Sequence, residues 1–523
     1  MTADAEQRRS LVPAAAAGRE PCPGRSPGPT PEQPLDLAGV GLGPCNLSLA
    51  ALAHGAGGLR TACYEQRAAF HWHPGLLIEG ATLQVPFLAD LVTLADPASP
   101  WSFLSYLKAH DRLFPFYFAE RFHIERAEYD AYCRWVSEQL AADAGHFGPP
   151  GTGPRFGHRV DAVRWCGQRG LFRVDFTRLA ADGTAAAAGH SYARHLVLGV
   201  GSEPHVPDAL RPLVDGTAGT EGTAGTDGEE PGDGGAPLIH SSRYLDHRER
   251  LSAADRVTVV GSGQSGAEVF LDLLRRRRAG REGLHWLTRA AAFAPMEYSK
   301  LGLEHFTPDY TRYFHALPEE TRDRLVPRQW QLHKAIDHGT LADIHDELYH
   351  RTLGGGWPDA TLTPGVRVRA VRRLPGGRLE LDLDHREQGE RARLVTDALV
   401  LATGYRERPL ETLLAPLAPY LRRDASGRPR ITEDYRLELD PAVSGSVFVQ
   451  NAERHTHGVG APDLGLAAHR AAVIVNSVAG VERYRLPERT AFTTFGLRAP
   501  RTGAHAAPRA RARTADSPAA GGR

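Results

Sequence analysis

Apolar residues in this chain gather in short runs, and two of these runs end at a turn that contains three glycines. The first run covers residues 35–39 and the second residues 257–260, and both are rich in the aliphatic side chains of buried strands. After each turn, apolar residues recur at the three- and four-residue spacing of a helix that packs on one face. The repeated order of strand, glycine turn and helix predicts an α/β fold with two parallel-sheet units.

The same kind of pattern continues along the rest of the chain. Further strands are expected at residues 61–65, 172–176, 195–201, 285–288, 399–405 and 445–450, and helices at residues 100–110, 125–140 and 464–478. We interpret residues 35–212 and 395–495 as two parts of a first unit, and residues 237–394 as a second unit inserted between them. A helical, histidine-bearing segment at residues 297–350 is expected to form a wall of the active site.

Three segments differ from the rest in composition. Residues 1–34, 213–236 and 496–523 are rich in Ala, Gly, Pro or Thr and have no hydrophobic period. Such segments cannot bury enough apolar surface to offset the entropy of ordering. We expect a disordered arm, a disordered insertion and a disordered tail.

Composition and charge exclude several classes of function. Lys plus Arg and Asp plus Glu number 62 each, so the net charge gives no reason to expect a nucleic-acid partner. No apolar run approaches the length of a membrane helix, and the first residues lack the pattern of a signal peptide. The five cysteines form no C-x-x-C pair, which argues against a disulfide framework, a zinc site and a redox dithiol. We therefore expect a cytoplasmic protein without a metal or a membrane partner.

The first glycine turn has the spacing of a dinucleotide-binding site. Gly41 and Gly43 follow the strand, and the helix after them offers free N–H groups to a pyrophosphate. Glu65 ends the next strand, where such folds place the acid that binds a ribose 2′-hydroxyl. The alternative interpretation of Glu65 is a surface acid at a strand end.

The second turn has the full G-x-G-x-x-G spacing between a strand and a helix. Gly261 permits the tight turn, Gly263 lets the backbone approach a phosphate, and Gly266 lets the helix pack closely on the strand. Arg289 follows the next strand, where an NAD-specific fold carries an acid, so it favours the 2′-phosphate of NADPH; the alternative is a solvated arginine. Together with the Ala-Thr-Gly-Tyr run at residues 402–405, the two turns indicate a flavoprotein that binds FAD and NADPH.

Motifs along most of the chain resemble those of one known family. They lie at residues 41–50, 72–73, 83–88, 90–97, 128–135, 402–405, 451–458 and 463–466. In this order they resemble the flavin-dependent N-hydroxylating monooxygenases of siderophore biosynthesis, the L-lysine and L-ornithine N-hydroxylases. The resemblance extends over residues 35–490, and within the family it is strongest to the diamine hydroxylases of desferrioxamine-type pathways.

The resemblance implies a reaction in which NADPH reduces FAD, O₂ adds to the flavin, and the C4a-hydroperoxide transfers one oxygen to an uncharged primary amine. The cofactor carries this chemistry, while the protein binds both nucleotides, excludes water and orients the amine. The resemblance places Gln84 at the reactive edge of the flavin as the catalytic position. It also implies a homotetramer, because members of the family tend to be tetrameric.

The remaining cofactor contacts that the resemblance implies fall into groups along the chain. They are Asn46, Glu65, Trp72 and His73 on the flavin side, Ser262, Gln264 and Ser265 in the NADP phosphate loop, and Thr403, Gly404, Tyr405, Asp463 and Leu464 near the flavin. His455, His457 and Asp463 have the composition of metal ligands, but within their motif they are expected to border the flavin and the substrate.

The substrate is indicated by two departures from the family. Ala89 and Leu303 occupy positions where amino-acid-specific relatives carry a lysine and an asparagine that bind the substrate carboxylate. Burying a carboxylate against two apolar residues is costly, so we expect a substrate that has no carboxylate. A linear diamine fits, with cadaverine first and putrescine second, and its distal ammonium requires an acceptor among Glu297, Glu304 and Asp463.

Alternatives remain for the substrate and for the class of protein. His333 and Gly465 are also expected at the substrate. An L-lysine N6-hydroxylase is the second hypothesis, with the carboxylate held by Lys300, His305 or His333. A disulfide reductase is disfavoured by the absence of a paired redox cysteine, and a flavin sensor by the intact second nucleotide turn.

Overall fold

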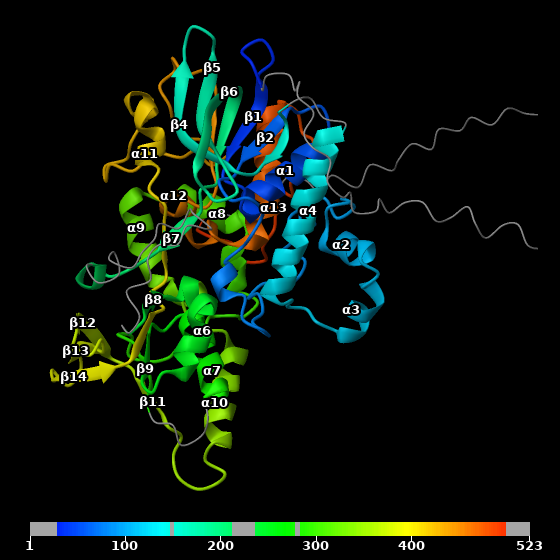
Figure 1. Cartoon of the computed structure of the whole chain (residues 1–523). Coiled ribbons are helices and arrows are strands. Elements are labelled where there is room, and N and C mark those ends of the chain that lie inside the picture. The colour runs from blue at the N-terminus through cyan, green and yellow to red at the C-terminus, as the bar shows by residue number, and fades with distance from the viewer. Residues whose placement is uncertain (1–28, 147–150, 212–235, 278–282, 498–523) are drawn as a thin grey trace, which may run out of the picture.

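The computed structural model describes residues 29–146, 151–211, 236–277 and 283–497. Nearly all of the expected arm (1–34), insertion (213–236) and tail (496–523) lies outside these residues. The chain forms two α/β units, one above the other in Figure 1. The expectation of two Rossmann-like units is confirmed.

The first unit is built on a seven-stranded sheet. Its path runs β3 (Gly153–Arg155), β2 (Thr61–Tyr64), β1 (Leu35–Val40), β6 (Ala185–Leu198), β5 (Leu171–Leu179) and β4 (His158–Cys166), and β17 (Val447–Val449) also pairs with β6. Strands β1, β2, β3 and β17 run parallel to their partners, whereas β4, β5 and β6 form an antiparallel extension. The sheet thus combines strands from the beginning and the end of the described chain.

Helices cover the parallel part of this sheet. α1 (Pro44–Ala56) packs against α13 (Ala467–Ala479) and α4 (Arg126–His146), and α2 (Phe103–Ala109) and α3 (Leu113–Ala119) lie outside α4 (Figure 1). Their apolar faces bury one core cluster, which includes fully buried Leu47, Tyr132 and Ile474. The expected helix at residues 464–478 begins with the short 3₁₀ turn η8 (Leu464–Leu466), because Asp463 accepts the Gly465 N–H.

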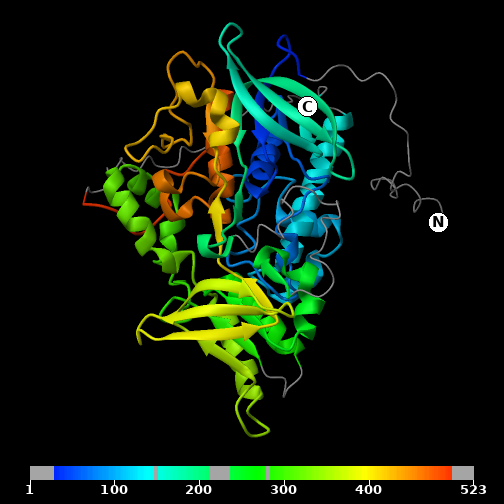
Figure 2. The same cartoon turned by 60° about the vertical axis from the view of Figure 1, so that its left-hand side comes forward.

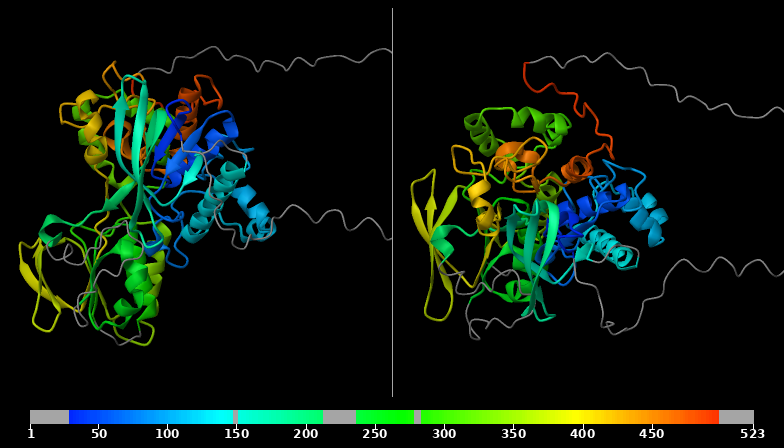
Figure 3. Two further views of the ribbon diagram at one scale, coloured as in Figure 1. Left: turned by 45° about the horizontal axis from the view of Figure 1, so that its top comes forward. Right: turned by 90° about the horizontal axis from the view of Figure 1, so that it is seen from above.

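The second unit is built on a five-stranded parallel sheet in the order β11 (Ala360–Thr363), β10 (Leu284–Leu287), β9 (Val257–Val260), β15 (Ala398–Leu401) and β8 (Leu238–His240). α6 (Tyr244–Ala253), α7 (Gln264–Arg276) and α10 (His338–His350) accompany it. An antiparallel sheet of β12 (Val366–Arg373), β13 (Leu379–His385) and β14 (Arg391–Thr396) projects from this unit (Figures 1 and 3). The sequence pattern had not indicated this sheet.

A helical excursion leaves the second unit between β10 and α10. It contains η4 (Leu303–Phe306), α8 (Pro308–His315), α9 (Glu319–Arg328) and η5 (Trp330–Leu332), and we call residues 303–332 the lobe. In Figures 1 and 2, α8 and α9 lie beside α12 (Arg454–His457) and the C-terminal elements of the first unit. β7 (Ser202–Pro204) and β16 (Tyr405–Glu407) pair at the junction of the two units. Among the described residues, no helix is long and apolar enough to cross a membrane.

Candidate functional site

The first glycine turn is fixed by hydrogen bonds from Asn46 and has open space beside Gly43. Gly41 has φ +83°, and a Cβ there would lie 2.5 Å from the Gly199 carbonyl oxygen. The Asn46 amide donates to the carbonyl oxygens of Val40 and Gly41 at 3.1 and 2.7 Å, and its Oδ1 accepts from Gln450 at 2.8 Å. The buried Asn46 side chain therefore fixes the turn through its backbone.

Open space lies at Gly43, in front of helix α1. A Cβ at Gly43 would meet no described atom within 4 Å, and no side chain caps the helix α1 that begins there. Glu65 is beside this turn, because its carboxylate accepts the Leu42 N–H at 2.9 Å. An uncapped helix N-terminus with a neighbouring acid fits a pyrophosphate and a ribose.

The second turn is packed more tightly. A Cβ at Gly261 would lie 2.0 Å from the Ala402 carbonyl oxygen, and a Cβ at Gly266 would lie 2.5 Å from the Gly261 carbonyl oxygen. Gly263 has more room, with the Lys334 carbonyl oxygen 3.6 Å away, and α7 has no side-chain cap. Ser262 and Ser265 flank Gly263 and are partly exposed at this helix N-terminus.

A chain of polar contacts links the second turn to Gln84 in the first unit. The Gln264 amide donates to the Glu268 carboxylate at 2.8 Å, and the other Glu268 oxygen lies 2.7 Å from the Arg126 guanidinium. Arg126 also donates to the Gln84 Oε1 at 3.4 Å. Gln84 and Gln264, which the sequence assigned to different cofactors, are thus joined through Arg126 and Glu268.

Aromatic rings fill the junction between the units. Tyr405 has edge contacts with His73 and His240, with ring centroids 5.4 and 5.2 Å apart. Trp72 contacts His73 and Tyr129 in the same way. Burial, together with nearby Arg126 and Arg67, lowers the pKa of His73 to about 4, so this imidazole is neutral near pH 7. Just before Tyr405, the Thr403 hydroxyl donates to the His205 carbonyl oxygen. The Gly404 carbonyl oxygen accepts the His205 N–H and contacts Nε2 of the His240 ring.

Ala89, Asp463 and Gly465 lie together. A Cβ at Gly465 would be 3.9 Å from the Ala89 Cβ, and Asp463 accepts the Gly465 N–H at 2.7 Å. Burial raises the pKa of Asp463 to about 6. Leu464, between them, packs on the core of the first unit. Ala89, one of the two positions that differ from the amino-acid-specific relatives, thus lies next to the Asp463 carboxyl group.

The other expected substrate residues lie on or near the lobe. Leu303 is 39% exposed, whereas both carboxylate oxygens of Glu304 accept main-chain N–H groups, from Phe492 and Thr493. Glu297 is exposed and accepts the Ser299 N–H at 2.6 Å. Burial lowers the pKa of His333 to about 4, and its Nε2 has no hydrogen-bond partner among the described residues.

Sequence reasoning missed four residues at this site: Arg126, Glu268, Tyr298 and Lys334. Burial raises the pKa of Tyr298, with Asp337 and Asp463 adding to the rise and Arg126 opposing it, so its phenol lies among these groups. Burial, with the charges of Arg454 and Arg289, lowers the pKa of Lys334. Arg126 and Glu268 were detectable as charges near two recognised motifs, but their pairing across 142 positions was not.

Candidate metal ligands are engaged elsewhere. His455 contacts the Pro429 carbonyl oxygen and His457 the Thr456 hydroxyl and the Glu433 carbonyl oxygen. In the part of the chain that the structure describes, no group of three His, Cys, Asp or Glu side chains could hold a metal ion.

Two sheets with adjacent parallel strands, each with a glycine turn and an uncapped helix N-terminus, define a protein with two dinucleotide-binding units. The model of the family described as L-lysine 6-monooxygenase/L-ornithine 5-monooxygenase matches residues 33–225 and 229–407. The chain belongs to this family, as its motifs had indicated.

Individual relatives agree with this assignment. The rhizobactin siderophore biosynthesis protein RhbE of Rhizobium meliloti is 42% identical over 470 residues, which cover 88% of this chain and 95% of that protein. A putrescine N-hydroxylase of Shewanella oneidensis is 36% identical over 460 residues, covering 88% and 84%. The crystal structure of DfoA from Erwinia amylovora, a cadaverine monooxygenase bound to FAD, superposes with a TM-score of 0.78 at 34% identity and covers 89% of this chain and 99% of DfoA.

Proposed function

We propose that this protein is an NADPH- and O₂-dependent FAD monooxygenase that N-hydroxylates one terminal amine of a diamine for hydroxamate siderophore biosynthesis. Cadaverine is the first substrate of this proposal and putrescine the second. The observation that carries it is the position of Ala89, an apolar residue that lies against Gly465 and beside Asp463. Names of relatives support it, since DfoA is a cadaverine monooxygenase and the Shewanella protein a putrescine N-hydroxylase.

FAD, when bound and reduced, supplies the activated oxygen that is transferred to the amine. In this proposal Gly41, Gly43 and the N-terminus of α1 hold its pyrophosphate, and Glu65 holds its ribose. Gln84 lies on the side of the first unit that faces the second unit, where it is held by Arg126. The neutral rings of Trp72, His73 and Tyr405 exclude water from the junction between the units.

NADPH is assigned to the second turn. Ser262, Gly263 and Ser265 would hold its phosphates, and Arg289 would bind the 2′-phosphate. Lys334 supports this assignment, because its pKa is lowered by burial and by the charges of Arg454 and Arg289. A cluster of cations of this kind is stabilised by an anion.

The diamine is oriented by its charge. Of the three acids considered, Glu304 is occupied by the main chain and Glu297 is exposed, so Asp463 is the acceptor that we assign to the distal ammonium. The reacting amine must be uncharged, and it faces the flavin. Ala89 and Leu303 form the apolar wall along the carbon chain.

A product assay tests the proposal. Hydroxylamine formation is measured with cadaverine, putrescine, L-lysine and L-ornithine at equal concentrations, with FAD and NADPH supplied. We expect cadaverine to give the highest kcat/KM. A preference for L-lysine of about tenfold, or 1.4 kcal/mol, would favour an L-lysine N6-hydroxylase that binds the carboxylate through Lys300, His305 or His333.

We further propose a cytoplasmic homotetramer. An exposed aromatic face on α3 supports association, since Phe114, Tyr117 and Phe118 are 78%, 71% and 75% exposed. Aromatic side chains of this size are enriched in the buried cores of protein interfaces. Sedimentation of the holoenzyme measures the oligomeric state, and Phe118→Asp is expected to reduce the number of associated subunits.

A further inference from the structure

The lobe is inserted in the second unit along the chain, but its polar side chains are bound to the first unit. It leaves and re-enters the second unit through a narrow stem, in which the Met296 N–H donates to the Ile336 carbonyl oxygen at 2.8 Å and the Ile336 N–H donates to the Ala294 carbonyl oxygen at 3.1 Å. Beyond this stem, its contacts include residues 488–495, residues 424–431 and the turn at residues 458–460. Together these contacts decide which unit carries the lobe.

The first contact is with a C-terminal strap, residues 488–495. Glu304 accepts the N–H groups of Phe492 and Thr493 at 2.9 and 2.7 Å. Asp309 accepts the Ala491 N–H at 2.9 Å and the Thr490 hydroxyl at 2.8 Å. Two carboxylates of the lobe therefore hold consecutive backbone groups of the strap.

Aromatic packing and a third polar contact complete this attachment. The Phe495 ring lies 5.0 Å from the Tyr310 ring and 5.9 Å from the Tyr313 ring, measured between centroids. Arg312 donates to the Glu488 carbonyl oxygen at 2.9 Å. The strap follows α13, which packs on α1, so it connects the lobe to the core of the first unit.

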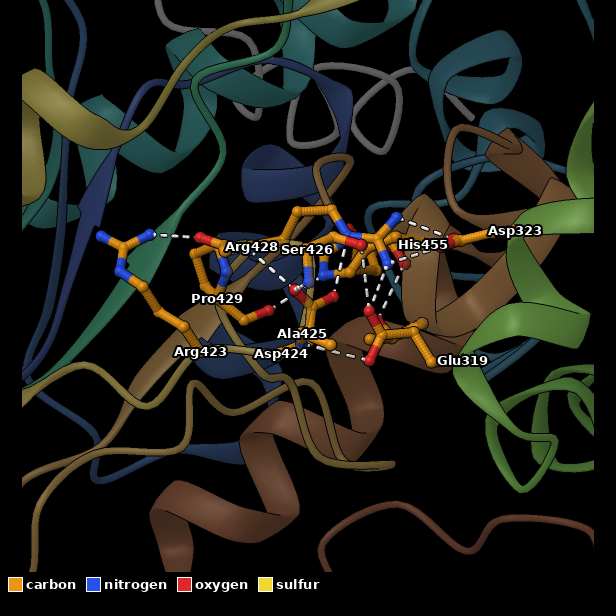
Figure 4. A network of polar contacts seen from close by, with 12 residues as sticks. Glu319, Asp323, Arg423, Asp424, Ala425, Ser426, Arg428, Pro429 and His455 are labelled. Carbon is orange, nitrogen blue, oxygen red and sulfur yellow. Dashed lines mark hydrogen bonds and ion pairs between the residues drawn. The ribbon is translucent and has the colours of Figure 1, made fainter.

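The second contact is an ion-pair cluster around Arg428 (Figure 4). The guanidinium of Arg428 binds both oxygens of Asp323 at 2.7 and 3.1 Å and lies 3.3 Å from Glu319, both on α9. Asp424 holds the same guanidinium in place at 2.8 Å. Bidentate arginine–carboxylate pairs are among the stronger ion pairs, and a network fixes their geometry better than an isolated pair.

The third contact is apolar and lies nearest to the proposed amine site. Phe314 is fully buried, and a Cβ on Gly458 would be 3.1 Å from its ring. Tyr310, Phe314 and Val459 form one buried cluster, so α8 rests on the short turn η7 (Gly458–Gly460) that precedes Asp463. His315 also contacts the Ile431 carbonyl oxygen at 2.9 Å.

We propose that the lobe is carried by the first unit, and that Glu304, Asp309 and Arg428 are positioning residues that fix Leu303 and the amine wall relative to Ala89 and Asp463. The amine pocket then keeps its shape when the second unit shifts on its stem to deliver or release its nucleotide. Glu304, considered from sequence as a substrate ligand, acts here through the strap. This inference rests on the proposed function for its kinetic readout.

The kinetic test uses Glu304→Gln and Arg428→Met in the full-length holoenzyme, with Glu320→Gln on the exposed face of α9 as the matched control. Each of the two test variants should raise the KM for cadaverine about tenfold, from the loss of hydrogen bonds to a charged group. The share of consumed NADPH that yields hydroxylamine should fall. Flavin reduction without amine and the KM for NADPH should stay within about twofold of the parent, and Arg428→Lys should recover part of the loss.

Hydrogen exchange gives a readout that does not depend on turnover. In both test variants, residues 303–328 should exchange faster while α10, on the second unit, keeps the parent's protection. If Glu304→Gln does not fold, Glu319→Gln replaces it, since Glu319 is a partly exposed residue on α9.

Unchanged exchange in the lobe, or an equal rise in KM for NADPH and amine, would overturn the inference. If the parent hydroxylates none of the four amines, the proposed function fails and the exchange experiment still decides the lobe's attachment.

Discussion

The guanidinium of Arg126 lies 2.7 Å from the carboxylate of Glu268, and this ion pair connects the first helix turn of α4 in one unit with α7 in the other. Both side chains are nearly buried, with 11% and 5% of their surface exposed. Gln84 and Gln264 bond to its two ends. The pair therefore sets the distance between the two proposed nucleotide sites.

Breaking this pair should reduce stability. Arg126→Met leaves Glu268 buried without a counter-charge, and we expect the free energy of unfolding to fall by about 3 kcal/mol. Burial already raises the pKa of Glu268, and Arg126 opposes that rise, so the variant should protonate Glu268 at higher pH. Denaturant titration measures the stability. Arg121→Met, which removes an exposed ion pair with Glu125, is the control and should change it by well under 1 kcal/mol. Equal effects would show that the Arg126 pair is not structural.

Gly43→Ala should separate cofactor binding from folding. Gly43 has φ −78° and an open environment, so the methyl group is sterically allowed in the protein itself. It would enter the space proposed for the FAD pyrophosphate. We expect a thermal transition within a few degrees of the parent and loss of bound flavin, measured by the absorbance of the purified protein. Gly41→Ala should instead impair folding, because its Cβ meets the Gly199 carbonyl oxygen at 2.5 Å. Full flavin content in Gly43→Ala would place the phosphate elsewhere.

Arg289→Ala should change the preference between coenzymes. An arginine–phosphate contact is about twice as strong as a neutral hydrogen bond, so the KM for NADPH should rise by about tenfold or more while that for NADH changes little. Stopped-flow reduction with each coenzyme measures this. Arg275→Ala, which removes an exposed ion pair with Asp343 on the same unit, serves as control. A parallel rise for both coenzymes would remove Arg289 from the 2′-phosphate site.

Ala89→Lys should move the substrate preference toward L-lysine. The new ammonium would lie close to Gly465, where it can pair with an α-carboxylate and repel a second ammonium. Flavin reduction by NADPH should be unchanged. The ratio of kcat/KM for L-lysine over cadaverine is the measurement, and Ala98→Lys at an exposed position is the control. No change in this ratio would show that Ala89 does not set specificity.

Asp463→Asn should affect both binding and stability in a pH-dependent way. Because burial raises the pKa of Asp463 from 3.8 to about 6, the folded state favours its proton, and this contribution is full below pH 3.8 and lost as the pH rises through 6. In the absence of amine, the variant should therefore gain about 2–3 kcal/mol relative to the parent between pH 4 and 7, measured by denaturant unfolding at each pH. Its KM for cadaverine should rise about tenfold above pH 6. A KM equal to the parent's at all pH values would exclude Asp463 as the ammonium acceptor.

The two glycine turns could be predicted because strand, turn and helix follow one another within about twenty residues. Gly266 packs on the Gly261 carbonyl oxygen within this local unit, whereas the backbone atom that excludes a Cβ at Gly261 belongs to Ala402, which only the structure brings close. The β12–β14 sheet was not predicted, although β12 alternates valines with arginines and β13 alternates leucines with acids, which is the period of a half-buried strand.

The polar links of the site lie beyond local patterns. The partners of Glu304 are main-chain N–H groups 188 and 189 residues away, and any residue type at those positions would offer them. Because Glu304 is an acid near the expected substrate motif, the sequence suggested that it binds the substrate. In the structure its carboxylate instead accepts hydrogen bonds from the strap. Tyr298 was equally hidden, since an isolated tyrosine after β10 has no distinguishing spacing.

The pairing of β17 with β6 also determines when the first unit can be completed during synthesis on the ribosome. Gln450, which binds Asn46 under the first glycine turn, is translated 404 residues after it. Until then the sheet lacks β17, and α1 lacks α13 as its packing partner. The second unit, whose strands all lie between residues 238 and 401, can be finished while the first still waits on the emerging chain. We therefore expect flavin capture to follow the synthesis of β17 and α13, and we expect a chain truncated before residue 447 to retain little flavin.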